Sequence, residues 1–312
     1  MKLARSYSRI AFMVLAMLMV LGLTVEAAPK STLRIGVSVN GLGNEFNRSA
    51  YYATLDAAKK AGHHVIAVDG KGEIRKMYDD MENLITQKVD AIINICGTLT
   101  AMVPVVQRAE RAGIPVISLD AGYVEGIAVE LCCNNWAIGA TIGTYLLNRM
   151  EGKGKVFSYI NPDHHGIRKR GDTFKAILKE YPSIELAGEH RVIWPNSIPD
   201  SRAAMESMLK ATPDVKGVFC GFDLPAIGVA QAIESAGRKD IIVVGCDGDI
   251  QALQYIKKGG PIVATIVQDA ETEARMAIDL AERLARGEKL KTKTEYAPFT
   301  LVTESNVDKF LK

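Results

Sequence analysis

The chain lacks any long run of charge of one sign. Its 312 residues contain 38 lysines and arginines against 36 aspartates and glutamates, and neither sign forms a long run. Proteins that bind nucleic acid concentrate basic residues in a patch or stripe that meets the phosphates. The composition therefore argues against a nucleic-acid ligand.

The motifs of the common catalytic and cofactor sites are also missing. The chain has no nucleophile elbow, phosphate loop or metal-ligand set. Gly41 and Gly43 begin a dinucleotide fingerprint, but its third glycine position holds Phe46. His164 and His165 are adjacent in the sequence, which is not the spacing of metal ligands. We therefore assign no catalytic residue and expect no cofactor and no metal.

Cysteines are few, and their spacing suits neither a metal site nor a redox site. The five lie at Cys96, Cys132, Cys133, Cys220 and Cys246, an odd number without a C-x-x-C pair. Neighbouring cysteines on a strand point to opposite faces, so a bridge between Cys132 and Cys133 would be strained. We expect buried free thiols, although one long-range disulfide stays open.

No apolar run is long enough to cross a membrane. The longest, residues 10–25, falls short of the roughly 20 residues that a spanning helix needs. Lys2, Arg5 and Arg9 precede it and small residues follow it, which is the pattern of a cleaved secretory signal. We predict a signal peptide at residues 1–27, with an uncleaved anchor as the alternative. Those residues carry the whole excess of two positive charges, so the remainder is neutral.

Short β-branched apolar runs alternate with helical patterns along the rest of the chain. This alternation predicts an α/β fold with parallel strands joined by crossover helices. The expected strands are Leu33–Val39, His64–Val68, Ala91–Ile95, Val116–Leu119, Ile127–Leu131, Lys155–Ile160, Val192–Trp194, Val218–Cys220, Ile241–Val244 and Val263–Ile266. The expected helices are Arg48–Ala61, Ile74–Gln87, Met102–Ala112, Ile167–Lys179, Asp200–Ala211, Pro225–Ala236, Ile250–Lys257 and Ala270–Arg286.

The two halves of the chain repeat the same plan, which predicts two similar sheets in two lobes. No proline- or serine-rich linker separates the halves. The connections between the lobes are therefore expected to be tight crossings and not a flexible tether.

Polar residues follow the predicted strands, where ligands of open parallel sheets bind. They are the segment 40–47 with Asn40, Asn44 and Asn47, then Asp120, Asp223, Asp247, Asp249 and Gln268, together with Arg168 and Trp194. Carboxylates and a guanidinium can bind adjacent hydroxyls in a bidentate way, and aromatic rings cover C–H surfaces. The mixture suits a polyhydroxylated ring. Arg168 could instead be a surface residue, and Phe46 and Trp194 could belong to the core.

At these positions the chain resembles the periplasmic sugar-binding proteins of the ribose-binding type, class I substrate-binding proteins of ABC importers. The resemblance covers residues 33–290. It depends on IGVSV at 35–39 with Asn44 and Phe46, GIPVISLD at 113–120, RKRG at 168–171, VVGCDG at 243–248 and ATIVQ at 264–268.

The resemblance implies a receptor that closes two lobes around a sugar or polyol without chemistry. It implies ligand contacts at Asn40, Asn44, Phe46, Asp120, Arg168, Trp194, Asp247 and Gln268. It also implies three hinge crossings near Cys133, Gln268 and Lys291, with an N-terminal lobe of 31–133 plus 269–291 and a C-terminal lobe of 134–268 plus 292–312. The expected partners are a permease in the inner membrane and in some systems a chemoreceptor. The protein itself is expected to be a monomer in the periplasm.

The chain departs from the ribose-type pattern at four positions of the site. Ala121 and Phe222 stand where that pattern has Arg and Asn, Asn47 replaces an aromatic residue, and Glu45 replaces Pro. Such changes argue against simple transfer of the ribose preference. We expect another sugar, a sugar alcohol, a cyclitol or a nucleoside-like ligand.

Three other functions were weighed against this one. A repressor of the lac type shares the two-lobed core, but the signal peptide and the missing helix-turn-helix exclude it. A carbohydrate-active enzyme would use paired carboxylates such as Asp247 and Asp249. A sensor-only receptor for a furanose signal would lack the import role.

Overall fold

A computed structural model describes residues 32–311, and its first six-stranded sheet is parallel throughout. Its strands run in the order β11-β5-β4-β3-β1-β2. Their bounds are β1 Arg34–Val39, β2 His64–Asp69, β3 Ala91–Ile95, β4 Val116–Leu119, β5 Val129–Cys133 and β11 Thr294–Ala297. The associated helices are α2 Glu45–Lys60, α3 Ile74–Thr86, η1 Leu99–Met102, α4 Val103–Arg111 and α10 Ala270–Ala285.

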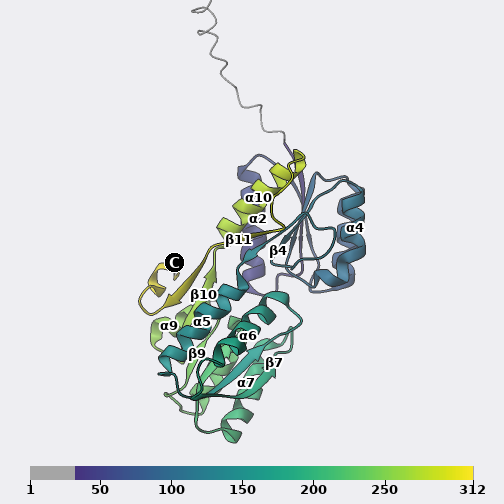
Figure 1. The fold of residues 1–312 in the computed structure, drawn as a ribbon. Coiled ribbons are helices and arrows are strands. Elements are labelled where there is room, and N and C mark those ends of the chain that lie inside the picture. Colours follow the sequence, from purple (N-terminus) through teal and green to yellow (C-terminus); the bar gives the residue numbers. More distant parts are fainter. Residues whose placement is uncertain (1–31, 312) are drawn as a thin grey trace, which may run out of the picture. The chain divides into compact units, whose positions relative to one another are not determined.

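Helices cover both faces of this sheet. Successive residues Ile92 and Ile93 of β3 belong to separate hydrophobic clusters, because neighbouring side chains of a strand point to opposite faces. One cluster contains residues of α2 and α10, and the other contains residues of α3 and α4. Figure 1 shows α2 and α10 side by side, with α4 on the far side of the sheet. Burial on both faces explains why the inner strands β1, β3, β4 and β5 are mostly apolar.

The second sheet repeats the arrangement with one antiparallel edge. Its order is β12-β10-β9-β8-β6-β7, and only β12 runs against its neighbour β10. The bounds are β6 Gly154–Ile160, β7 Ile184–Arg191, β8 Val215–Cys220, β9 Ile242–Val244, β10 Ile262–Gln268 and β12 Phe299–Thr303. The helices are α5 Asn135–Arg149, α6 His165–Leu178, α7 Ser197–Ala211, α8 Asp223–Ser235, α9 Ile250–Lys258 and η2 Val307–Lys309. The α/β fold with two parallel sheets is therefore confirmed.

The chain passes between the sheets three times. Strand β5 of the first sheet ends at Cys133, where the first passage begins, and α5 then packs on the second sheet. Strand β10 ends at Gln268, and α10 returns to the first sheet. The third passage differs from the expectation near Lys291, because β11 pairs with β5 in the first sheet as far as Ala297. Pro298 alone separates β11 from β12 of the second sheet.

One strand prediction was wrong and two strands were missed, all three at the edges of the sheets. Strand β7 covers Ile184–Arg191 and not Val192–Trp194. The prediction failed because an edge strand with an exposed face carries polar residues, and its sequence pattern is that of a loop. Strands β11 and β12 were missed for the same reason. The predicted secretory signal lies outside the described residues. Among residues 32–311 no helix is both long and apolar enough to span a membrane.

Candidate ligand-binding cleft

A cavity of about 280 Å³ lies where loops of the two sheets meet. The first sheet contributes residues that follow β1, β3 and β4, and the second contributes residues that follow β6, β7, β8 and β9. The lining consists of Asn40, Asn44, Phe46, Asn47, Cys96, Gly97, Thr98 and Asp120 from the first side, and of Asn161, Asp163, His164, Ile167, Arg170, Trp194, Phe222, Leu224 and Asp247 from the second. All follow the carboxyl ends of parallel strands, where the fold leaves backbone free to meet a ligand.

The cleft gathers eight of the eleven residues named from the sequence: Asn40, Asn44, Phe46, Asn47, Asp120, Trp194, Phe222 and Asp247. The remaining three, Arg168, Asp223 and Gln268, lie outside the lining. Sequence reasoning passed over Arg170, Ile167 and Leu224, among others.

Two asparagines shape the loop after β1. The Asn44 side chain caps helix α2 by accepting a hydrogen bond from the Asn47 backbone N–H at 2.8 Å. The Asn47 side-chain amide in turn donates to the Gly41 carbonyl oxygen at 2.8 Å. These bonds fix the first turn of α2, so that Phe46 lies in the cleft wall and is buried.

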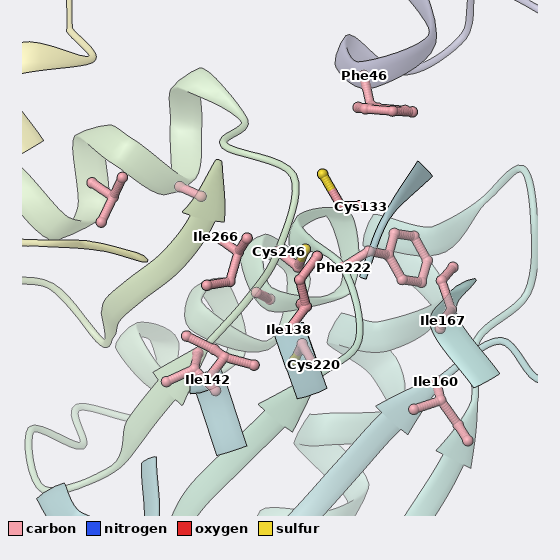
Figure 2. Packing of buried hydrophobic residues seen from close by; sticks show 14 of the residues in the cluster. Phe46, Cys133, Ile138, Ile142, Ile160, Ile167, Cys220, Phe222, Cys246 and Ile266 are labelled. Carbon is pink, nitrogen blue, oxygen red and sulfur yellow. The ribbon is translucent and has the colours of Figure 1, made fainter. Parts of the chain in front are cut away.

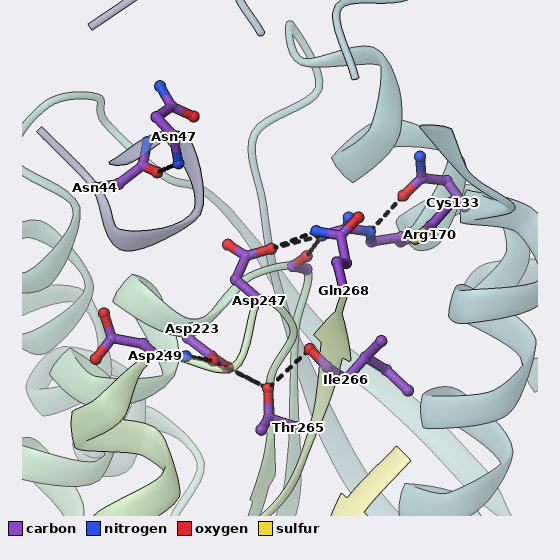
Figure 3. A network of polar contacts seen from close by, with 12 residues as sticks. Asn44, Asn47, Cys133, Arg170, Asp223, Asp247, Asp249, Thr265, Ile266 and Gln268 are labelled. Carbon is purple, nitrogen blue, oxygen red and sulfur yellow. Dashed lines mark hydrogen bonds and ion pairs between the residues drawn. The ribbon is translucent and has the colours of Figure 1, made fainter. Parts of the chain in front are cut away.

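An ion pair between the buried Arg170 and the partly buried Asp247 forms the floor of the cleft (Figure 3). Nη1 of Arg170 lies 3.4 Å from Oδ1 of Asp247 and donates to the Gly221 carbonyl oxygen at 2.9 Å. Nε of Arg170 donates to Oδ1 of Asn135 at 2.7 Å. The Gln268 amide donates to the same Asp247 oxygen at 3.2 Å. Burial raises the pKa of Asp247 to about 7, although the Arg170 charge acts in the opposite direction.

The guanidinium in the cleft thus belongs to Arg170, and the expectation for Arg168 is corrected. Arg168 is exposed, and its Nη1 donates to the Pro162 carbonyl oxygen at 2.9 Å. Residues two apart on a helix face different directions, whereas residues three apart share a face. Ile167 and Arg170 have that spacing, and both line the cleft. The sequence offered this signal, because Phe174 extends the same buried face.

Asp223 supports the cleft from behind and does not line it. Its carboxylate is fully buried, accepts the Thr265 hydroxyl at 2.8 Å and accepts the Asp249 backbone N–H at 2.8 Å. Burial raises the pKa of Asp223 well above its usual range, and the Asp247 charge adds to the shift. A Cβ at Gly245 would lie 2.1 Å from Oδ1 of Asp223, so only glycine fits there. Asp223 therefore holds the turn that carries Asp247.

Three lining residues have a backbone conformation that side chains rarely adopt. Cys96, Asp120 and Asp247 have φ values of 57°, 49° and 129°. Cys96 and Asp120 come directly after β3 and β4, and Asp247 lies three residues after the end of β9. Such conformations cost about 1–3 kcal/mol each and persist where the surrounding structure enforces them, which is common at ligand sites.

Two buried side-chain polar atoms of the lining have no partner within the described residues. Oδ1 of Asp120 and Nδ1 of His164 are both buried without a hydrogen bond. Buried polar atoms are nearly always paired, so these two are available to a ligand. Burial lowers the pKa of His164, which keeps its imidazole neutral at pH 7. His164 stacks on His165, and residues 32–311 contain no group of three potential ligands that could hold a metal ion.

The cysteines are buried free thiols, as expected (Figure 2). Figure 2 shows Cys133, Cys220 and Cys246 among the apolar side chains near the second sheet. Burial raises the pKa of all five thiols, which keeps them protonated and unreactive.

Comparison with known proteins agrees with this architecture. The chain is 31% identical over 281 residues to the ribose import binding protein of Bacillus subtilis (strain 168), covering 88% of both proteins. It is 28% identical over 275 residues to a D-apiose import binding protein of Actinobacillus succinogenes, covering 86% of this chain and 87% of that one. It superposes with a TM-score of 0.84 and 29% identity on an ABC transporter solute-binding protein from Agrobacterium vitis with bound allitol, covering 90% and 98% of the two chains.

The match to the periplasmic binding protein domain extends over residues 35–289. That range begins in β1 and ends after α10, so it includes both sheets except their edge strands β11 and β12, and every residue of the cleft lining. The chain belongs to the periplasmic binding protein domain family, within which it is related to the solute-binding proteins of sugar importers.

Proposed function

We propose that this protein binds a sugar or polyol in the cleft and presents it to an ABC importer. The observation that carries the proposal is the cleft lining, in which hydrogen-bonding groups and aromatic rings come from both sheets. Carboxylates, amides and a guanidinium bind vicinal hydroxyls, and Phe46, Trp194 and Phe222 offer faces for C–H surfaces.

The charges in the cleft favour a neutral ligand. Asp120 and Asp247 bring two carboxylates against the single buried guanidinium of Arg170. The Asp163 carboxylate pairs with Arg191. Phosphorylated sugars and other anions would meet uncompensated carboxylates, which costs free energy in a partly desolvated site.

Closure of two lobes around the ligand is the mechanism that fits the topology. The proposed first lobe contains residues 33–133 and 270–297, and the second contains residues 134–268 and 299–311. A ligand that contacts Asp120 of one lobe and Asp247 of the other binds the closed form better than the open form, which shifts the equilibrium to closure. The permease would recognise the closed form.

The relatives support the biological setting. Two of them are named for import of ribose and of D-apiose, and a structural relative contains bound allitol. The leader at residues 1–27 fits export to the periplasm with cleavage of the signal peptide. Binding without catalysis, by a monomer that delivers its ligand to an inner-membrane permease, completes the proposal.

The test uses residues 28–312 in a thermal-shift screen and calorimetry against sugars, polyols, cyclitols, nucleosides and amino acids. A ligand at 100 times its Kd stabilises the protein by about 2.7 kcal/mol, so a hit raises Tm clearly. Asp247→Ala should abolish the shift, while Asp249→Asn, which keeps the cap of α9 and lies outside the lining, should preserve it. Binding restricted to amino acids, or equal binding by Asp247→Ala, would overturn the proposal.

A further inference from the structure

Four apolar side chains of the second sheet form one corner of the cleft. This apolar corner consists of Ile167, Trp194, Phe222 and Leu224, all of which line the cavity. Figure 2 shows the Phe222 ring beside Ile167. Phe222 and Ile167 are buried, whereas the Trp194 side chain is 39% exposed at the rim.

The fold fixes this corner tightly. A Cβ at Gly221 would lie 2.8 Å from Cγ2 of Ile167, so the isoleucine packs on the backbone directly before Phe222. Phe222 is the N-cap residue of α8 and has no side-chain capping bond, and Leu224 lies in the first turn of the same helix. Capping positions normally hold polar residues. With Phe222 at this position, α8 lacks a side-chain capping hydrogen bond, and the cleft has an apolar wall instead.

The polar groups of the cleft are concentrated away from this corner. The four side chains follow three strands that are consecutive at one side of the sheet: Trp194 follows β7, Ile167 follows β6, and Phe222 and Leu224 follow β8. Asp247 follows β9, on the other side of β8, and is joined there by Arg170 and Gln268. The lining residues that follow β7 and β8 are therefore apolar, and the pair of Arg170 and Asp247 lies beside β9, whereas the loop after β6 adds Asn161, Asp163 and His164.

Polar residues near the apolar corner are mostly engaged with each other. The Asp163 carboxylate pairs with Arg191, and Oδ1 of Asn161 accepts the Asp163 backbone N–H at 3.0 Å. The neutral imidazole of His164, with its unpaired Nδ1, is the exception and marks the border between the two ends. A ligand hydroxyl placed against Phe222 and Leu224 would lose its bonds to water without replacement.

We propose that the ligand is polyhydroxylated at one end and apolar at the other, as in a sugar or polyol whose terminal hydroxyl is replaced by hydrogen or by an alkyl group. This inference rests on the proposed function and narrows its substrate class. The hydroxylated end meets Asp120, Arg170 and Asp247, and the apolar end meets the corner. Exchange of a hydroxyl for hydrogen or an alkyl group in an apolar pocket changes the affinity for the ligand by about tenfold or more.

The experiment compares matched pairs by calorimetry: D-ribose with 5-deoxy-D-ribose, D-allose with 6-deoxy-D-allose, and D-galactose with D-fucose. At least one deoxy member should bind about tenfold tighter than its parent. In Leu224→Asn, at a half-buried position, this preference should fall to about onefold or reverse, and Phe222→Asn provides a second variant. Ile193→Asn, exposed beside Trp194 and outside the lining, should keep the full preference.

The outcomes separate the two proposals. Parents that bind as tightly as their deoxy partners, or tighter, overturn the inference and leave the sugar-binding function in place. A preference that survives in both Leu224→Asn and Phe222→Asn also overturns it. An intact fold that binds no sugar, polyol or deoxy analogue overturns the proposed function itself.

Discussion

Cys133 and Glu273 are joined by a hydrogen bond of 3.2 Å from Sγ to Oε1. Cys133 ends β5 at the first passage between the sheets, and Glu273 lies in the first turn of α10 just after the second. The same sulfur lies 3.3 Å from the carbonyl oxygen of Pro298, at the third passage. One buried thiol and one buried carboxyl therefore connect all three passages of the chain.

Glu273 should make stability fall as pH rises through neutrality. Burial, with the Asp120 charge, raises the pKa of Glu273 from 4.5 to about 8. Between those values the folded state holds a proton that the unfolded state has lost. The stabilisation is therefore complete below about pH 4.5 and is lost as pH rises to about 8. We expect the stability difference between the native protein and Glu273→Gln to change by about 2 kcal/mol from pH 6 to pH 8.

Urea unfolding at several pH values measures this difference. The glutamine keeps an oxygen for the Cys133 thiol but cannot titrate, so its stability should fall less steeply with pH. Asp247, whose pKa is raised to about 7, contributes the same slope to both proteins. Parallel pH profiles for the native protein and the variant would show that Glu273 is ionised in the folded state.

Removal of Arg170 should destabilise the protein strongly. Arg170→Ala leaves the carboxylate of Asp247 without its cationic partner and Asn135 without its bond. Loss of one partner of a buried ion pair costs about 3–5 kcal/mol. Arg168→Ala, two residues away and exposed, should change stability by less than about 0.5 kcal/mol. Chemical denaturation compares the two, and equal effects would refute the different roles given to these arginines.

A methyl group at Gly245 should disrupt the turn behind the cleft. The added Cβ would lie 2.1 Å from Oδ1 of Asp223, which Thr265 and the Asp249 N–H hold in place. Overpacking of this kind costs about 1–3 kcal/mol, and displacement of Asp223 should also weaken sugar binding. Gly43→Ala is the matched control, because its Cβ meets nothing within 4 Å. The Tm values of the two variants should differ clearly; similar values would contradict the packing argument.

The thiols should resist modification in the folded protein. All five cysteines of the sequence are buried and free, and burial raises their pKa values. Without reductant, Ellman's reagent should react with none of them rapidly in buffer and with all five in guanidinium chloride. Three reactive thiols after unfolding would reveal a disulfide in the folded protein, contrary to the structure.

Predictions from the sequence succeeded where a local pattern has one physical cause. Predominantly apolar runs such as 91–95 are strands buried on both faces, and the structure has β3 at those residues. Polar residues directly after such runs, including Asp120 and Asp247, meet in the cleft because parallel strands present their carboxyl ends at one edge. Edge strands such as β7 were not predicted, because polar residues on their exposed face interrupt the apolar pattern.

The amino-acid sequence by itself determined the α/β class, the doubled plan, the family and eight positions of the cleft lining. The class and the doubled plan follow from strand and helix periodicity, the lining residues from the polarity of residues at strand ends, and the family from the resemblance of its motifs. Only the tertiary structure decided that Arg170 and not Arg168 reaches Asp247, that Asp223 lies behind the cleft, and that the third passage is at Pro298. Those facts depend on which helix face turns inward and which strands pair, and contacts between residues distant in the chain decide both.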